Sequence, residues 1–231
     1  SLTFSTFTGA VSDNWGFTAT PDIYGNLFGG GIVFGSNYPI TTGSFDETFN
    51  NTSNAGMFDV GITKFNADGT SLLYSTFIGG SGNETPHSIV CDENGDLFIY
   101  GITSSTNFPM SGTSFDISFN GGPNENENSL SFNGTDIYIA RLSADGSNLL
   151  ASTYVGGSQT DGLNTGSLNY NYGDQFRGEI TLDENGNVYV SSTTYSSDFP
   201  TVNANQGFLN GNQDAVLFKM PPTLNTLTWS T

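Results

Sequence analysis

The sequence is poor in several residue types that carry chemistry in proteins. Its 231 residues include one cysteine, one histidine and four lysine or arginine residues, against 22 aspartate and glutamate residues. The single Cys91 cannot form an internal disulfide, and its place in an apolar strand-like segment indicates a buried free thiol. Because His87 is the only histidine, we expect neither a Ser-His-Asp triad nor a zinc site that needs several histidines.

The shortage of basic residues gives the chain a formal net charge of -18. Such a field repels phosphate groups, so nucleic acids and anionic membrane surfaces are poor candidate partners, whereas divalent cations and cationic protein surfaces are compatible with it. The sequence also lacks an apolar run long enough to span a bilayer, and we therefore expect no direct membrane insertion.

Long stretches with apolar residues at helical spacing are also missing. The 30 glycines and an aromatic content of 13% fit many short strands that are joined by turns. The sequence therefore predicts an all-β fold with almost no helix.

One apolar phrase occurs four times: LTFSTF from Leu2, LLYSTF from Leu72, LLASTY from Leu149 and LTWST from Leu227. An aspartate and a following proline are separated by the same interval in three places: Asp22 with Pro39, Asp92 with Pro109 and Asp183 with Pro200. A second aspartate stands at a constant distance before the next phrase, at Asp59, Asp136 and Asp214. The phrase therefore marks off three repeats of similar length, and the chain is an array of one structural unit.

Each repeat contains four strand-like segments, which is typical of a propeller blade. Several of these segments are apolar without alternation, as expected of a sheet whose two faces are covered by neighbouring blades. We predict blades at residues 11–80, 81–157 and 158–231, and an orphan outer strand of a further blade at residues 1–10. Because closed propellers have at least four blades, we expect the chain to be a sector of a larger ring.

The segments LLYSTFIGGSGNE, CDENGDLFIYGITSSTNFP and TDIYIARLSADGSNLLAST together resemble the bacterial β-propeller repeat family called SBBP. The resemblance covers nearly the whole chain, with departures at residues 8–10 and at Pro221-Pro222. It implies a secreted or surface-displayed protein of a Gram-negative bacterium, in some cases a cargo of the type IX secretion system of gliding species. Its partners would be proteins at the cell surface or in the outer-membrane secretion and adhesion machinery, and the family implies no catalytic residues.

The length differences between repeats fall in connections that should emerge on one rim of the ring. The turns in DENGD, DENGN, NADGT and SADGS are tight, because glycine stands where a hairpin needs positive φ, and they should lie on the opposite rim. Long loops on a rigid scaffold are common binding sites. The candidate loops are residues 37–57, 107–134, 158–176 and 199–212.

The insertion SLNYNYGDQF combines aromatic and polar residues, as carbohydrate-binding and protein-binding loops often do. The candidate ligand-binding residues are Tyr170, Tyr172, Phe176, Arg177, Asp161 and Asp174. Alternatively, these loops simply pack over the tops of the blades.

Residues that recur in every repeat have structural explanations. The six repeated aspartates are expected to hydrogen-bond within hairpins and at strand ends. One basic residue per repeat indicates an ion pair or an alkyl stem over apolar surface, at Lys64, Arg141 and Lys219. The turns DENGD and DENGN begin like a calcium loop but lack its glycine position and its bidentate glutamate, so we expect no metal and no cofactor there. Acidic loops on the variable rim leave Ca²⁺ as an alternative.

These observations favour a non-catalytic propeller that serves as a scaffold or adhesion module and binds protein partners through its variable rim. The alternative is a lectin-like propeller that binds glycans through Tyr170, Tyr172 and Phe176. A glycosidase or lyase with loop carboxylates is a third hypothesis, because two carboxylates suffice for such chemistry, although nothing in the sequence singles out a pair.

Overall fold

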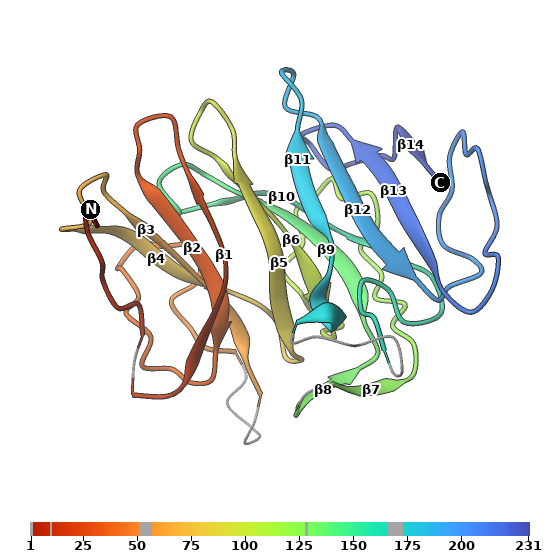
Figure 1. Cartoon of the computed structure of the whole chain (residues 1–231), viewed down its shortest axis with the longest axis horizontal. Helices are drawn as coiled ribbons and strands as arrows, with labels where there is room; N and C mark the ends of the chain where they lie inside the picture. The colour runs from red at the N-terminus through yellow and green to blue at the C-terminus, as the bar shows by residue number, and fades with distance from the viewer. Residues whose placement is uncertain (1, 10, 51–56, 128, 166–172) are drawn as a thin grey trace.

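In the computed structural model, which describes residues 2–9, 11–50, 57–127, 129–165 and 173–231, three four-stranded antiparallel sheets fan out side by side (Figure 1). The first contains β1 (Asn14–Pro21), β2 (Leu27–Val33), β3 (Asp59–Phe65) and β4 (Leu72–Ile78). The second contains β5 (Glu84–Cys91), β6 (Leu97–Thr103), β9 (Asp136–Leu142) and β10 (Leu149–Val155). The third contains β11 (Glu179–Leu182), β12 (Val188–Thr194), β13 (Asp214–Met220) and β14 (Trp229–Ser230).

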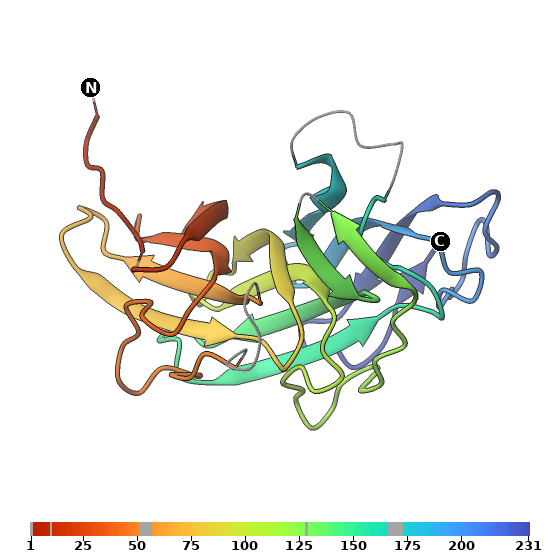
Figure 2. The ribbon, with the colours of Figure 1, turned by 90° about the horizontal axis from the view of Figure 1, so that it is seen from below.

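The predicted all-β propeller architecture is confirmed, since each sheet is one blade whose strands pair in chain order. A short hairpin, β7 (Asn124–Glu127) and β8 (Leu130–Asn133), lies between β6 and β9, and helix in the described residues is limited to the 3₁₀ turn η2 (Asp174–Phe176). Figure 2 shows β4 and β10 along the outer side of the fan and the β7–β8 hairpin on the inner side. No helix in this part of the chain is long and apolar enough to cross a lipid bilayer.

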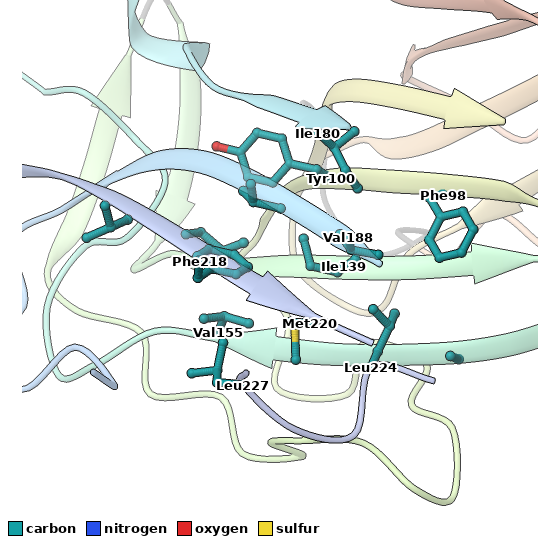
Figure 3. Packing of buried hydrophobic residues seen from close by; sticks show 14 of the residues in the cluster. Phe98, Tyr100, Ile139, Val155, Ile180, Val188, Phe218, Met220, Leu224 and Leu227 are labelled. Atoms are coloured by element: carbon teal, nitrogen blue, oxygen red, sulfur yellow. The ribbon is translucent and has the colours of Figure 1, made fainter. Parts of the chain in front are cut away.

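The middle blade explains why its strands read as continuous apolar runs. All seven residues of β6 are buried, as are six of the seven residues of β9. On one face, Phe98, Tyr100 and Ile139 pack against Val188 and Phe218 of the third blade (Figure 3). A second cluster joins the other face to the first blade. Both faces of this sheet are therefore dry.

The described residues cover only one of the two faces of the third blade. Buried and exposed residues alternate along β13, where Leu217 is 46% exposed, whereas its counterpart Ile139 in the middle blade is fully buried. In Figure 1, β13 and β14 form one end of the fan. The three blades thus form a sector of a propeller, as predicted.

The recurring phrase forms the outermost strand of each blade and binds a loop to that strand's free edge. In β10, the backbone N–H of Tyr154 donates to the Asp116 carbonyl at 3.1 Å, and the N–H of Asp116 donates to the Thr153 hydroxyl at 2.9 Å. In β4, the N–H of Phe77 donates to the Asp46 carbonyl at 3.0 Å, and the N–H of Asp46 donates to the Thr76 hydroxyl at 2.8 Å. The loops predicted for the variable rim therefore also cover sheet edges that would otherwise expose unpaired backbone groups.

Residues 2–9 form no strand, in contrast to the predicted orphan strand. A β-strand needs a neighbour for its backbone hydrogen bonds, and the described sheets already pair in complete sets of four. One contact of this segment is nevertheless close, because a Cβ added to Gly69 would lie 2.1 Å from Phe4. Phe7, by contrast, is fully exposed.

Candidate functional site

The rim that carries the tight turns, here called the constant rim, is held by the first set of repeated aspartates. The backbone N–H groups of Asn94 and Asp96 donate to Asp92 Oδ1, both at 2.9 Å, and Gly95 adopts a φ of 89°. Asp22 and Asp183 accept equivalent bonds in the other blades. In the third blade, the Asn187 amide and backbone N–H donors hold the pKa of Asp183 below its usual value.

The repeated basic residues bind these aspartates. The Arg141 guanidinium lies 2.7 Å from Asp96 and 3.4 Å from Asp92, and it sits 5.1 Å from the centroid of the Phe98 ring. An ion pair and a ring contact occur at the same position in the other two blades: Lys64 with Asp22 and Phe28, and Lys219 with Asp183 and Tyr189. Each cation is thus held between a carboxylate and an aromatic face.

Two of these cations also connect neighbouring blades. Lys64 Nζ lies 3.3 Å from the carbonyl oxygen of Ala144 in the next blade, and Arg141 Nη1 lies 3.4 Å from that of Pro222. The repeated charges of the constant rim therefore stabilise the scaffold, through ion pairs within each blade and hydrogen bonds between blades.

On the opposite rim, here called the variable rim, two buried acids occupy equivalent positions. Glu84 has no exposed surface and accepts hydrogen bonds from the hydroxyls of Thr103, at 2.6 Å, and Ser105. Asp161, which the sequence placed among the ligand-binding residues, is equally buried and accepts from Ser196 at 2.9 Å and from Thr194. The prediction for Asp161 is therefore corrected, because its carboxylate is enclosed by side chains of its own blade.

The second set of repeated aspartates lies beside these acids. A Cβ added to Gly79 would approach Glu84 to 2.7 Å and Asp59 to 2.8 Å, so the two carboxyl groups are close neighbours. Asp136 stands in the same relation to Asp161, and its carboxylate accepts the backbone N–H of Asn120 at 2.6 Å. Asp59 and Asp214 accept the N–H of Asn50 and Asn210 in the same way.

Burial raises the pKa of these enclosed acids. The pKa of Glu84 rises to about 8, because burial and the neighbouring Asp59 both disfavour its anion. Burial raises the pKa of Asp136 to about 7 and that of Asp161 to about 6. Among the residues that the structure describes, no group of three or more His, Cys, Asp or Glu side chains is arranged to hold a metal ion.

An open pocket of about 320 Å³ lies where the inner strands of the three blades approach one another. Its lining comes from β1, β5 and the segment that leads into β11: Trp15, Gly16, Phe17, His87, Gly173, Gln175, Phe176, Arg177 and Gly178. The Phe176 ring contacts Phe17 and His87, with 5.5 Å between ring centroids in each case. Trp15, Phe17 and Phe176 thus give the pocket an aromatic wall, which suits the apolar face of a ligand.

Several polar groups lie at this pocket. His87 is buried, its Nε2 lies 3.0 Å from the Thr85 hydroxyl, and its Nδ1 has no hydrogen-bond partner in the described part of the chain. Burial lowers the pKa of His87 to about 3, so the ring is neutral near pH 7. Gln175 Oε1 is likewise buried without a described partner. The Arg177 side chain is 68% exposed and donates to Asp174 Oδ1 at 2.5 Å.

The structure thus brings three of the predicted ligand-binding residues, Asp174, Phe176 and Arg177, to the pocket or its mouth. Tyr170 and Tyr172 lie outside the described residues. Sequence reasoning missed Trp15 and His87, which come from other blades. Their signal was weak, because a single aromatic residue in a strand becomes a pocket wall only when its strand is known to be innermost.

Part of the variable rim packs over the blades, which was the alternative interpretation of the loops. Leu130 and Phe132 of β8 are buried, and the Phe132 ring lies 5.8 Å from Phe58 and 6.3 Å from Phe176 between centroids. The hairpin therefore supports one wall of the pocket. Exposed apolar side chains of the variable loops include Ile117, at 68%, and Phe208, at 67%.

Comparison with known families agrees with the fold. Residues 178–200 match the SBBP family, which is described as a beta-propeller repeat. The chain carries an SBBP repeat. The matched SBBP segment contains the interval from Asp183 to Pro200, whose length recurs in the other two blades. No curated protein matches the chain.

Proposed function

We propose that this propeller is a non-catalytic scaffold or adhesion module, secreted by or displayed on a Gram-negative bacterium, that binds a protein partner through its variable rim. The contrast between the two rims carries the proposal. On the constant rim, the repeated carboxylates and cations bind one another and the adjacent turns. The variable rim presents the aromatic pocket and long loops that carry the exposed Ile117 and Phe208. The constant rim also exposes Ile23 and Tyr24, but on a tight turn.

The enclosed acids support a non-catalytic role. A glycosidase needs two carboxyl groups that face a sugar, one as an acid and the other as a base or nucleophile. Neither Glu84 nor Asp59 has exposed surface, and hydroxyl groups of the middle blade donate hydrogen bonds to the Glu84 carboxyl group. The acid pair of Asp136 and Asp161 is enclosed in the same way.

Binding to outer-membrane fractions from a Gram-negative bacterium tests the proposal with a matched pair of variants. The double variant Ile117→Ser and Phe208→Ser changes the variable rim, and Ile23→Ser with Tyr24→Ser changes exposed residues of the constant rim. We expect the first pair to weaken saturable binding by about 10-fold or more, since losing apolar contacts costs about 1–2 kcal/mol at an interface. Weakening by the second pair alone would contradict the proposal.

A second candidate is recognition of a neutral glycan in the aromatic pocket. Sugars present apolar faces to aromatic rings and hydroxyl groups to polar atoms, and the pocket offers Trp15 and Phe176 together with the exposed Arg177 side chain. A glycan array tests this candidate. We expect the intact protein to give glycan signals. Trp15→Ala and Phe176→Ala should each abolish these signals, and Tyr24→Ala on the constant rim should leave them unchanged. An array without signals for the intact protein would rule it out.

A further inference from the structure

One face of the third blade points away from the middle blade and is here called the end face. It has the composition of an interface between blades. Its residues are Tyr189, Ser191, Ala215, Leu217, Lys219 and Trp229, and the register places Tyr189, Lys219 and Trp229 in one row across the sheet. The corresponding row of the middle blade, Phe98, Arg141 and Ala151, faces the third blade. The end face therefore presents to solvent what the middle blade uses for packing.

At each junction between two described blades, the outer strand of one blade meets a turn of the next blade. This turn, here called the third turn, joins the third and fourth strands of a blade. A Cβ added to Gly146 would lie 2.4 Å from Tyr74 of the preceding blade. Phe4 occupies the same position relative to Gly69 of the first blade, at 2.1 Å. An aromatic side chain thus covers a turn glycine, and the absence of a glycine side chain makes the contact possible.

The junction between the middle and third blades has the two sizes exchanged. Ala151 stands at the position of Tyr74, and Leu224 stands at the position of Gly146, within one hydrophobic cluster. Leu224 keeps the left-handed turn conformation, with a φ of 52° beside 71° for Gly146. Non-glycine residues rarely adopt this conformation, so the exchange indicates that one large and one small residue must meet here.

In β14, Trp229 stands at the position of Tyr74. It is larger than the equivalent residues Phe4, Tyr74 and Ala151. Its ring is only half-buried and contacts Tyr189, with centroids 6.5 Å apart. Since one large and one small residue meet at each junction, Trp229 fits a turn that has glycine at the position of Gly146. A turn with leucine at that position would clash with it. Lys219 adds a second element, since Lys64 and Arg141 at its position each donate to a carbonyl oxygen in the third turn of the next blade.

We propose that the end face of the third blade docks a further blade of the same repeat, one whose third turn carries glycine at the position of Gly146. Trp229 covers that glycine, and Lys219 donates to a carbonyl oxygen of the same turn. The pairing of large with small residues then dictates which blade can follow the third one.

Gly69 of a second molecule provides such a turn once Phe4 no longer covers it. Removal of residues 1–10 leaves all four strands of the first blade in place, because the described part of this segment forms no strand. We expect the shortened protein to associate head to tail at concentrations up to about 100 µM in sedimentation velocity, while the complete chain associates at least 10-fold more weakly.

Within the shortened protein, Trp229→Ala and Gly69→Leu should each weaken association by about 10-fold or more. Leu150→Ala, which changes an exposed residue of the middle blade, should leave association unchanged. Leu224 shows that a leucine is tolerated in this turn, so Gly69→Leu can fold. A shortened protein that stays monomeric would overturn the proposal, as would association that persists in Trp229→Ala.

Discussion

At the scale of single residues, the contact between Tyr74 and Gly146 is sensitive to one methyl group. We predict that Gly146→Ala lowers the free energy of unfolding by about 1–3 kcal/mol. The added Cβ would lie 2.4 Å from the Tyr74 ring, and alanine is strained at a φ of 71°. Urea denaturation followed by tryptophan fluorescence measures the change.

A double-mutant cycle separates the steric part of this effect from the backbone part. The variant with both Tyr74→Ala and Gly146→Leu reproduces the pair of Ala151 and Leu224 at the next junction. We expect the double variant to be more stable than the sum of the single changes by about 1–2 kcal/mol. Strictly additive losses would show that the two residues do not restrict each other's size.

The buried Glu84 predicts an unusual pH dependence. Its pKa is about 8 in the folded protein, above the usual value of 4.5 for the unfolded chain, so the folded state binds more protons between these values. Stability is therefore greatest at the acid end of this window and falls as the pH rises to about 8, by at most about 1.4 kcal/mol per pH unit for this group. Urea midpoints across this range measure the slope.

Glu84→Gln isolates this contribution. Asp136 and Asp161 act with the same sign, but their pKa values of about 7 and 6 end their effect earlier. We expect Glu84→Gln to lower the slope across the whole window from about pH 5 to 8 and to leave the curve nearly flat between pH 7 and 8, where Asp136 and Asp161 no longer contribute. Glu93→Gln, an exposed control on the constant rim, should leave the slope unchanged. Equal slopes in all three proteins would contradict a protonated Glu84.

At the scale of structural elements, the threonine of the recurring phrase joins the outer strand to its loop. Thr153→Val leaves the N–H of Asp116 without its acceptor, and we expect a loss of about 1–3 kcal/mol in the free energy of unfolding. Hydrogen exchange should quicken at the amides of Asp116 and Tyr154, which lie in the same edge contact. Thr153→Ser keeps the hydroxyl and should stay close to the original protein; if it loses as much as the valine variant, the hydroxyl is not the cause.

Strands and turns could be predicted from the sequence because their causes are local. The glycine of each DENG turn and the apolar run after it lie within a few residues of one another. Residues 2–9, predicted as the outer strand of a further blade, form no strand here, because pairing depends on a neighbouring sheet rather than on the segment itself. The position of Asp161 was equally hidden, since Thr194 and Ser196, which enclose it, come from the end of β12 and the loop that follows, far along the chain.

The pocket was predictable only in part for the same reason. Phe176 and Arg177 lie at the end of one long insertion, whose aromatic and polar residues predict a binding loop. Trp15 and His87 reach the same space from β1 and β5, so their role follows from the arrangement of three blades around a common inner side. Repeats reveal what is common to the blades, whereas a site assembled from different residues of each blade leaves no repeated pattern.

At the scale of the whole molecule, excess negative charge opposes the compact state. The chain has 22 acidic and four basic residues, and its repeated cations are already paired, so repulsion between carboxylates dominates the long-range electrostatics. We predict that the melting temperature rises by a few degrees between low salt and about 0.3 M NaCl, as the screening length shortens below about 10 Å. A falling melting temperature would mean that screening of the ion pairs outweighs relief of the repulsion.

Calcium at matched ionic strength extends this experiment to the acidic loops. Screening depends on ionic strength, whereas a bound ion stabilises the folded state in proportion to the logarithm of its concentration above the dissociation constant. We expect CaCl₂ and NaCl to give the same melting temperature, because the described carboxylates are not gathered in groups of three or more. A further rise that continues with the logarithm of the CaCl₂ concentration, and that EDTA reverses, would instead assign a calcium site to the variable rim.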